Sequence, residues 1–155
     1  DQGFLYIENN ILAGRVNTQG RDIFIETSGL AGRSTMKFNL VNSPRIDWGS
    51  TVYTSLSSFQ VATGKGLYSI SSSPAFVNPS GGDFHLFSGS PAIAAGDGDP
   101  GGVYQKFLAR YGISIAVDFV GAARTPGAPD LGVYETTKSS SRIPPVAPTN
   151  VRIVP

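Results

Sequence analysis

Short runs of hydrophobic residues, interrupted by polar ones, recur along the first part of this chain. Segments 4–10 and 22–28 each pass through apolar residues into an Ile-Glu pair, and the second pair follows the first by 18 residues. Both segments lead into a Leu-Ala-Gly-Arg sequence, at 12–15 and 30–33, again 18 residues apart. Such runs are typical of β-strands, and the spacing is at the short end of the range for stacked repeats. We therefore expect repeated turns of chain, each burying its apolar face against the next.

Residues 36–42 look like a third repeat, with Phe38 and Leu40 facing inward and Asn39 at a turn. Asparagines gather at the expected corners of these repeats. One interpretation is that their amides bind sugars. The other, which the pattern favours, is that they adopt the left-handed backbone conformation at a corner and bond to the neighbouring repeat. This second interpretation applies to Asn9, Asn10, Asn39 and Asn42.

The alternation weakens between residues 44 and 65, where Ser, Thr and Gly surround scattered aromatic residues. This composition predicts a loop that leaves the stack of repeats, and such excursions carry function more often than the repeats do. The only tryptophan, Trp48, either stacks on a sugar ring or covers the repeat beneath it. The candidate carbohydrate-binding residues are Trp48, Tyr53, Arg45 and Lys37.

One helix is expected after Asp99, which is a good N-cap residue and precedes Pro100 in the first turn. Gly112 ends the helix, and its apolar residues share one face: Val103, Phe107, Leu108 and Tyr111. In a stack of strands we expect this helix to cover the exposed edges of the last repeat.

The same segment suggests calcium, the one cofactor to which the sequence points, because Asp97 and Asp99 stand two residues apart. A calcium loop of the EF-hand type needs a further oxygen ligand where Gly101 stands and a bidentate Glu where Leu108 stands. A capped helix explains the two carboxylates more simply.

Composition narrows the class of protein. At 155 residues and 16.3 kDa the chain is long enough for one folded domain, and 19 Gly and 11 Pro against 15% charged residues favour strands joined by tight turns. A net charge of +1 provides no basic stripe for nucleic acid. The absence of cysteine excludes disulfides and thiol catalysis. The sequence shows neither an apolar run long enough to cross a membrane nor a leader peptide. If the protein is secreted, we expect its leader to lie upstream of Asp1 or to have been removed.

Three motifs stand in the second half of the chain: Gly-Asp-Phe-His-Leu-Phe-Ser-Gly-Ser-Pro-Ala-Ile-Ala-Ala-Gly at 82–96, Asp-Phe-Val-Gly-Ala-Ala-Arg at 118–124, and Asp-Leu-Gly-Val-Tyr-Glu at 130–135. They resemble the C-terminal segment of secreted right-handed parallel β-helix proteins of the pectin-lyase-like superfamily, in particular the choice-of-anchor Q type. Residues 73–79 match a further sequence of that group, with Ser73 where Asp is usual. The motif positions are Asp83, Phe84, Leu86, Ser90, Pro91, Gly96, Asp118, Gly121, Arg124, Asp130, Gly132, Tyr134 and Glu135.

The resemblance implies an all-β fold, in which residues 1–135 form the C-terminal coils of a right-handed parallel β-helix with one short capping helix. A Ser/Pro-rich linker follows at 136–148. Residues 149–155 resemble the first strand of a fibronectin type III-like β-sandwich, or a strand for donation to a neighbour.

The charged motif residues allow two interpretations. Asp130, Glu135 and Arg124 are either acid/base machinery or a closing structure in which carboxylates cap turns, and the Gly-rich corners favour the closing structure. His85, the sole histidine, has no implied nucleophile or orienting partner, which speaks against catalysis.

For function, the resemblance implies an extracellular or cell-surface protein that binds or cleaves polysaccharides, as a lyase or glycoside hydrolase whose active site lies largely outside this segment. Lyases of that group use a Lys or Arg base, for which the chain offers Arg15, Arg33, Lys37 and Arg45, without a clear carboxylate cluster. The alternative is a non-catalytic scaffold, adhesion or filament-forming module. The expected partners are a polysaccharide, upstream β-helix coils or another copy of the chain.

Overall fold

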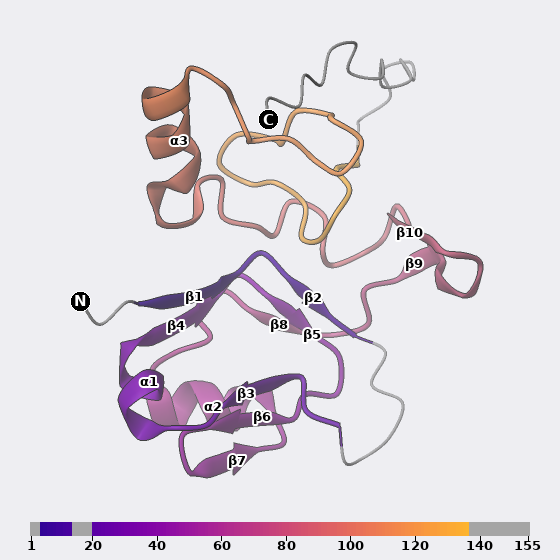
Figure 1. The fold of residues 1–155 in the computed structure, drawn as a ribbon. Helices are drawn as coiled ribbons and strands as arrows, with labels where there is room; N and C mark the ends of the chain where they lie inside the picture. Colours follow the sequence, from indigo (N-terminus) through magenta and orange to yellow (C-terminus); the bar gives the residue numbers. More distant parts are fainter. Residues whose placement is uncertain (1–3, 14–19, 137–155) are drawn as a thin grey trace, which may run out of the picture.

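The computed structural model describes residues 4–13 and 20–136 and places them in two halves (Figure 1). Residues 4–13 and 20–71 form layered strands and two helices, in the lower half of that view. Residues 88–136 form a third helix and long loops, in the upper half, and a hairpin over 76–86 projects beside the junction.

Parallel pairing joins the strands of the lower half into layers. The first three strands each pair with a later one: β1 (Leu5–Glu8) with β4 (Ser34–Lys37), β2 (Ile11–Leu12) with β5 (Leu40–Val41), and β3 (Ile23–Ile25) with β6 (Ile46–Trp48). On its other side β5 pairs with β8 (Ile70–Ser71). Two successive passages of the chain therefore lie one on the other, and part of a third follows.

Antiparallel pairing completes the sheets. β6 turns back at Gly49, whose φ is 62°, into β7 (Thr51–Tyr53), and β9 (Phe76–Asn78) pairs with β10 (Asp83–Leu86) across a short 3-10 turn, η1 (Pro79–Gly81). A positive φ favours glycine at position 49 because side chains crowd the backbone in that conformation.

The predicted all-β right-handed parallel β-helix is wrong. Over residues 4–13 and 20–136 the structure shows four separate sheets of two or three strands, with both parallel and antiparallel pairs, and three α-helices. The 18-residue repeat does not set the register either. Ile7 lies opposite Met36, which is 29 residues away, and not opposite Ile25. The two Ile-Glu pairs resemble each other because each follows a short apolar run, but the strands concerned belong to different sheets. Hydrophobic alternation alone does not determine which strands pair.

The region predicted to be a loop, 44–65, is also more regular than expected. It contains β6, β7 and helix α2 (Leu56–Thr63). Ser55 accepts a hydrogen bond from the Ser58 amide at 3.1 Å and so caps the helix, while Leu56 and Phe59 bury one face of it. An eight-residue helix with this many Ser and Thr residues gives a weak sequence signal, and burial of Phe59 decides its formation.

Helix α1 (Ser28–Arg33) connects β3 to β4 and is capped by Thr27, whose Oγ1 accepts from the Leu30 amide at 3.2 Å. This helix occupies part of the second Leu-Ala-Gly-Arg sequence. The first copy includes Arg15, which lies outside the described residues, as do the linker from 137 onward and the expected strand at 149–155.

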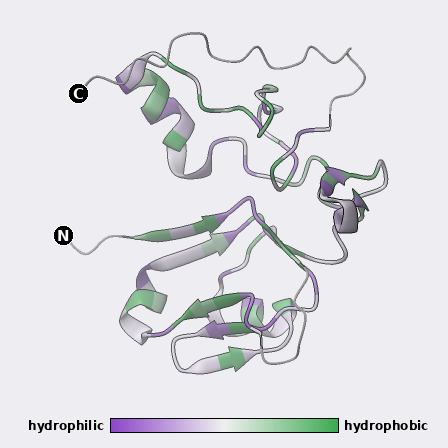
Figure 2. Ribbon diagram, turned by 45° about the vertical axis from the view of Figure 1, so that its right-hand side comes forward, coloured by the Kyte–Doolittle hydropathy of each residue, from purple (hydrophilic) through white to green (hydrophobic). Residues whose placement is uncertain are grey.

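The helix predicted after Asp99 is confirmed as a short 3-10 turn, η2 (Pro100–Gly102), that continues into α3 (Val103–Tyr111). The Asp99 carboxylate accepts from the Tyr104 amide at 2.7 Å, and Gly112 ends the helix with a φ of 68°. The expected covering role is not observed. α3 buries none of its residues, and hydrophobic and hydrophilic residues both remain on its surface (Figure 2).

Two hydrophobic cores hold the molecule together. The first lies within the lower half, where Phe59 and Trp48 pack edge to face with centroids 5.1 Å apart, and it includes Ile23, Ile25, Ala31, Met36, Val41, Ile46, Trp48, Leu56 and Phe59. The second combines Leu40 of the strand layers with Leu86, Ala92 and Leu131 from later in the chain. Leu40 and Leu131 are both completely buried, so the second core joins the two halves.

Asparagine side chains tie the strand layers to one another. Asn39 is completely buried, and its Nδ2 donates to the carbonyls of Ile7 at 2.7 Å and Lys37 at 2.8 Å. Its Oδ1 accepts from the Asn10 amide at 3.0 Å, while Asn9 adopts a left-handed φ of 61°. The bonds between layers that the sequence favoured are thus present at Asn10 and Asn39, while the left-handed conformation occurs at Asn9 alone of the four asparagines.

Candidate functional site

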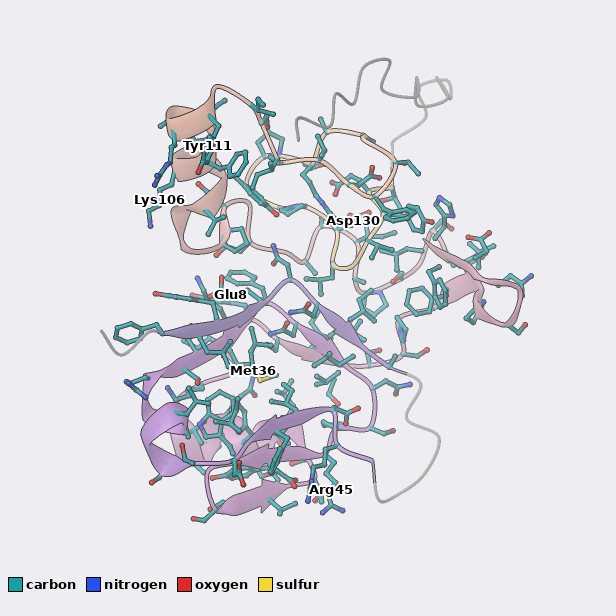
Figure 3. All side chains as sticks on the ribbon, viewed as in Figure 1. Glu8, Met36, Arg45, Lys106, Tyr111 and Asp130 are labelled. Atoms are coloured by element: carbon teal, nitrogen blue, oxygen red, sulfur yellow. The ribbon has the colours of Figure 1, made fainter. Side chains whose placement is uncertain are left out.

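Three charged side chains converge where the two halves meet. Glu8 and Lys37 are the last residues of β1 and β4 and stand opposite each other in the register, while Asp97 comes from the loop that leads to α3. The Lys37 Nζ lies 3.0 Å from Asp97 Oδ2 and 3.7 Å from Glu8 Oε1. We call these three residues the carboxylate–lysine cluster. Glu8 lies along the side of β1 that faces the upper half (Figure 3).

The Glu8 carboxylate is buried without a hydrogen bond. Its side chain is 2% exposed, and no described residue donates to either of its oxygens. The 3.7 Å separation from Lys37 Nζ is longer than a hydrogen bond, so the contact is electrostatic only. Buried polar atoms almost always have a hydrogen-bond partner, which makes a carboxylate without one a feature that needs a functional or structural reason.

The three groups of the cluster have shifted pKa values. Burial raises the pKa of Glu8, and the neighbouring Lys37 ammonium only partly offsets this. The hydrogen bond to Asp97 raises the pKa of Lys37. Burial opposes ionisation of Asp97, but the Asp99 amide and the Lys37 ammonium together hold the pKa of Asp97 below its usual value.

Asn9 fastens the loop that carries Asp97 to the end of β1. Its Nδ2 donates to the Asp97 carbonyl and its Oδ1 accepts from the Asp97 amide, both at 2.7 Å. The Asn9 carbonyl accepts from the Gly132 amide at 3.2 Å. Two segments of the upper half are thus bound at the residue next to Glu8.

The ammonium of Lys37 already occupies the position between the two carboxylates of the cluster. Asp99, the second candidate calcium ligand, turns toward the Tyr104 and Gln105 amides at 2.7 and 3.4 Å. Across the described part of the chain, no three His, Cys, Asp or Glu residues gather in a way that would hold a metal ion. Asp97 and Asp99 therefore act here as an ion-pair partner and a helix cap.

A second group of carboxylates closes the upper half. Asp118 Oδ1 accepts from the amides of Val120 at 2.9 Å and Ala122 at 2.8 Å, and its Oδ2 accepts from the Glu135 amide at 3.0 Å. Asp130 accepts from the Ala94 amide at 2.8 Å and, through its other oxygen, from the amide and hydroxyl of Thr136. Thr136 is thus bonded to this closing structure.

Glu135 and Arg124 complete the closing network. Glu135 accepts from the Thr125 amide at 3.0 Å and the Asp130 amide at 3.1 Å. Arg124 donates to the carbonyls of Asp130 at 3.0 Å and Gly132 at 2.7 Å, with its Nη1 3.6 Å from Glu135. All three carboxylates serve backbone amides, which is the geometry of the closing interpretation and not of an acid/base pair facing a substrate.

The remaining motif residues have structural contacts as well. Ser90 Oγ donates to the Pro74 carbonyl at 2.6 Å, and Leu86 belongs to the second core. Tyr134 stacks on His85 at 3.9 Å, and His85 in turn contacts Asp83 at 2.6 Å. Phe84 packs edge to face on Phe76 and Pro91 is exposed, while left-handed or crowded backbone positions are occupied by Gly96, Gly121 and Gly132.

The four candidate carbohydrate-binding residues do not form one surface. Trp48 is 6% exposed in the first core, the location that the covering interpretation expects, and Tyr53 packs on Phe59 in the same region. Arg45 lies at the far end of the strand layers from Glu8 (Figure 3), with its Nε 3.4 Å from Asp47 Oδ1. Lys37 alone belongs to the carboxylate–lysine cluster.

An aromatic pair, an exposed Tyr68 on a partly buried Phe38, stands beside that cluster. Tyr68 stacks on Phe38 with centroids 4.7 Å apart and planes inclined by 21°, and the Lys37 Nζ is 5.4 Å from the Phe38 ring. Tyr68 is 69% exposed. Phe38 and Tyr68 both have positive φ values, 50° and 58°.

Sequence reasoning missed Glu8 and Tyr68 as members of a site. Glu8 was visible only as the end of an apolar run, and its partner Lys37 becomes evident once the 29-residue register between β1 and β4 is known. Tyr68 has no motif around it. The signal that could have found Glu8 is its alternation with Ile7, which sets it on the opposite face from the core.

No family model, curated protein or solved structure matches this chain. Within the residues that the structure describes, none of the helices has the length and apolar character needed to cross a bilayer.

Proposed function

We propose that this chain is a non-catalytic structural module that assembles with further copies of itself, head to tail, through the unpaired edges of its strands. The observation that carries the proposal is the strand order. Among the described strands, β1, β2 and β3 each pair on one side only, with β4, β5 and β6. The other ends of the two three-stranded sheets are the edge strands β8 and β7.

Unpaired strand edges present backbone N–H and C=O groups that another strand can satisfy. Exposed aromatic residues lie in these edge strands or next to them, with Phe4 71%, Tyr6 58% and Phe24 50% exposed. Because the two edges of a sheet belong to different strands, a contact between the β3 edge of one copy and the β7 edge of the next is heterologous. Contacts of that type continue into filaments when they do not close into a ring.

The hydrogen bonding of the buried carboxylates in the upper half supports a non-catalytic role. Asp118, Asp130 and Glu135 are buried, and each accepts hydrogen bonds from backbone amides. An extracellular or cell-surface setting is the one that the resemblance of the three motifs to secreted proteins supports.

Assembly is tested by sedimentation velocity over a range of protein concentrations, with electron microscopy of the same samples. We expect the sedimentation coefficient to rise with concentration and short linear particles to appear. Phe24→Lys places a charge on the β3 edge and should raise the concentration needed for association about tenfold, which corresponds to about 1.4 kcal/mol. The control is Val61→Lys, because Val61 is 90% exposed and lies in helix α2 and not in an edge strand, and this variant should behave as the wild type. A wild-type chain that stays monomeric at all concentrations contradicts the proposal.

Binding of a polysaccharide is a second proposal, favoured by the exposed Tyr68 ring, which stacks on Phe38. A sugar ring stacks on an exposed aromatic face. We expect oligosaccharides to shift the NMR signals of residues near Tyr68, and Tyr68→Ala to weaken the binding about fivefold, since stacking contacts of this size are worth on the order of 1 kcal/mol. Tyr111→Ala is the control, because Tyr111 is also exposed, beside Phe107 and Arg110. An equal loss of binding in both variants would contradict a sugar-binding site at Tyr68.

A further inference from the structure

The carboxylate–lysine cluster has one cation for two carboxylates. Lys37 Nζ is hydrogen-bonded to Asp97 Oδ2 at 3.0 Å, and the Glu8 Oε1 atom, 3.7 Å from the same nitrogen, is left without a hydrogen bond. The Glu8 side chain is 2% exposed, so water does not compensate its charge. A buried carboxylate that is ionised without accepting a hydrogen bond is costly even beside a cation, and the cost falls when the group holds a proton.

The bond from Lys37 to Asp97 also connects the two halves of the molecule. Lys37 belongs to β4, and Asp97 to the loop that precedes α3. Asn9 holds the same loop through the amide and carbonyl of Asp97. Any movement of the Lys37 ammonium from Asp97 toward Glu8 therefore acts on the junction.

We propose that Glu8, Lys37 and Asp97 form a proton-controlled latch between the strand layers and the loop before α3. When Glu8 holds a proton, Lys37 bonds to Asp97 and the loop is fastened. When Glu8 loses its proton, the new charge draws the Lys37 ammonium toward Glu8 and the loop is loosened. The latch does not depend on the proposed assembly.

The neighbouring charged groups do not provide a substitute for Lys37. The Asp99 carboxylate, from the same loop, bonds to the amides of α3, and the Lys106 Nζ of α3 bonds to the Gly101 carbonyl at 2.9 Å. From the strand layers, Lys37 is the group that faces Glu8 across the β1–β4 pair. Among the described residues the switch thus has one proton site, Glu8, and one mobile cation.

The direction of the pH effect on stability follows from the pKa shifts of Glu8 and Asp97. Because burial raises the pKa of Glu8, its contribution to folding stability is full below the ordinary value of 4.5 and is lost as the pH rises through the folded-state pKa. The lowered pKa of Asp97 acts oppositely, since its contribution is present above 3.8 and is lost as the pH falls. The loop should therefore be held most firmly in mildly acidic solution.

The test follows amide hydrogen exchange of Asp97, whose N–H donates to Asn9, in the full chain between pH 4 and pH 8. The Ile70 amide, bonded to the Asn39 carbonyl within the strand layers, is the internal reference. After correction for intrinsic exchange, protection of Asp97 should fall with rising pH, about tenfold for each unit by which the pKa of Glu8 is raised. Glu8→Gln mimics the protonated state and should keep the high protection at every pH.

Two further variants separate the latch from general effects. Lys37→Met should lower Asp97 protection and remove its pH dependence, because the mobile cation is gone. Glu26→Gln removes an exposed carboxylate of the same strand layers and should leave the wild-type profile unchanged. In the wild type, the carbon-13 signal of the Glu8 carboxyl reports its titration directly, so the proposal is tested even if a variant does not fold. Titration of Glu8 at or below 4.5, or a wild-type pH profile in Glu8→Gln, would overturn the latch.

Discussion

At the scale of single residues, glycine permits two close approaches between backbone segments. A Cβ added at Gly98 would lie 2.5 Å from the Gly127 nitrogen and 2.7 Å from its Cα, and one added at Gly96 would lie 2.9 Å from the Pro129 carbonyl oxygen. These neighbours are backbone atoms, which cannot turn aside as the end of a side chain can. Both contacts join the loop around Asp97 to residues 127–129.

Gly98→Ala should therefore destabilise the protein, by about 1–3 kcal/mol, the usual cost of forcing an extra group into packed structure. The measurement is urea denaturation followed by circular dichroism. Gly89→Ala is the matched control, because a Cβ there meets nothing within 4 Å, and its effect should remain within about 0.5 kcal/mol. Equal denaturation midpoints for the two variants would show that the backbones at 98 and 127 are not in contact.

At the scale of elements, the sequence predicted those helix ends that depend on residues close together in the chain. Asp99 and Gly112 correctly bracket a helix, because a side-chain cap and a left-handed glycine act within a few residues. Helix α2 escaped prediction because its Ser-rich sequence has little intrinsic tendency, and the buried Phe59 supplies the stabilisation. The hairpin β9–β10 falls within motifs that the sequence had already singled out, but its pairing is a property of the structure.

At the scale of the whole molecule, the second core decides how the two halves hold together. Leu40 comes from β5, whereas Ala92 and Leu131 come from the upper half, and all three are completely buried. The polar contacts at Asn9 and Lys37 lie at the same junction. Apolar burial should supply most of the stability of the junction, and the carboxylate–lysine cluster should modulate it.

Leu131→Ala should accordingly lower the free energy of unfolding by about 2–5 kcal/mol, because it leaves a cavity in the core shared by the halves. Val133→Ala, two residues further and 51% exposed, should change it by about 0.5 kcal/mol or less. Thermal and urea denaturation of both variants provide the measurement. A loss for Leu131→Ala no larger than that for Val133→Ala would mean that the halves do not share a core.

The sequence determined the features that depend on neighbours along the chain: a strand-rich lower half, corner asparagines that bond between layers, a capped helix after Asp99, and carboxylates at 118, 130 and 135 that close Gly-rich turns. The tertiary structure decided which strands pair. Register depends on burial across tens of residues, and an 18-residue similarity in the sequence had no counterpart in the 29-residue pairing of β1 with β4. It also decided the carboxylate–lysine cluster, since Glu8, Lys37 and Asp97 lie far apart in the chain and meet only because the strand register and the second core bring both halves to one junction.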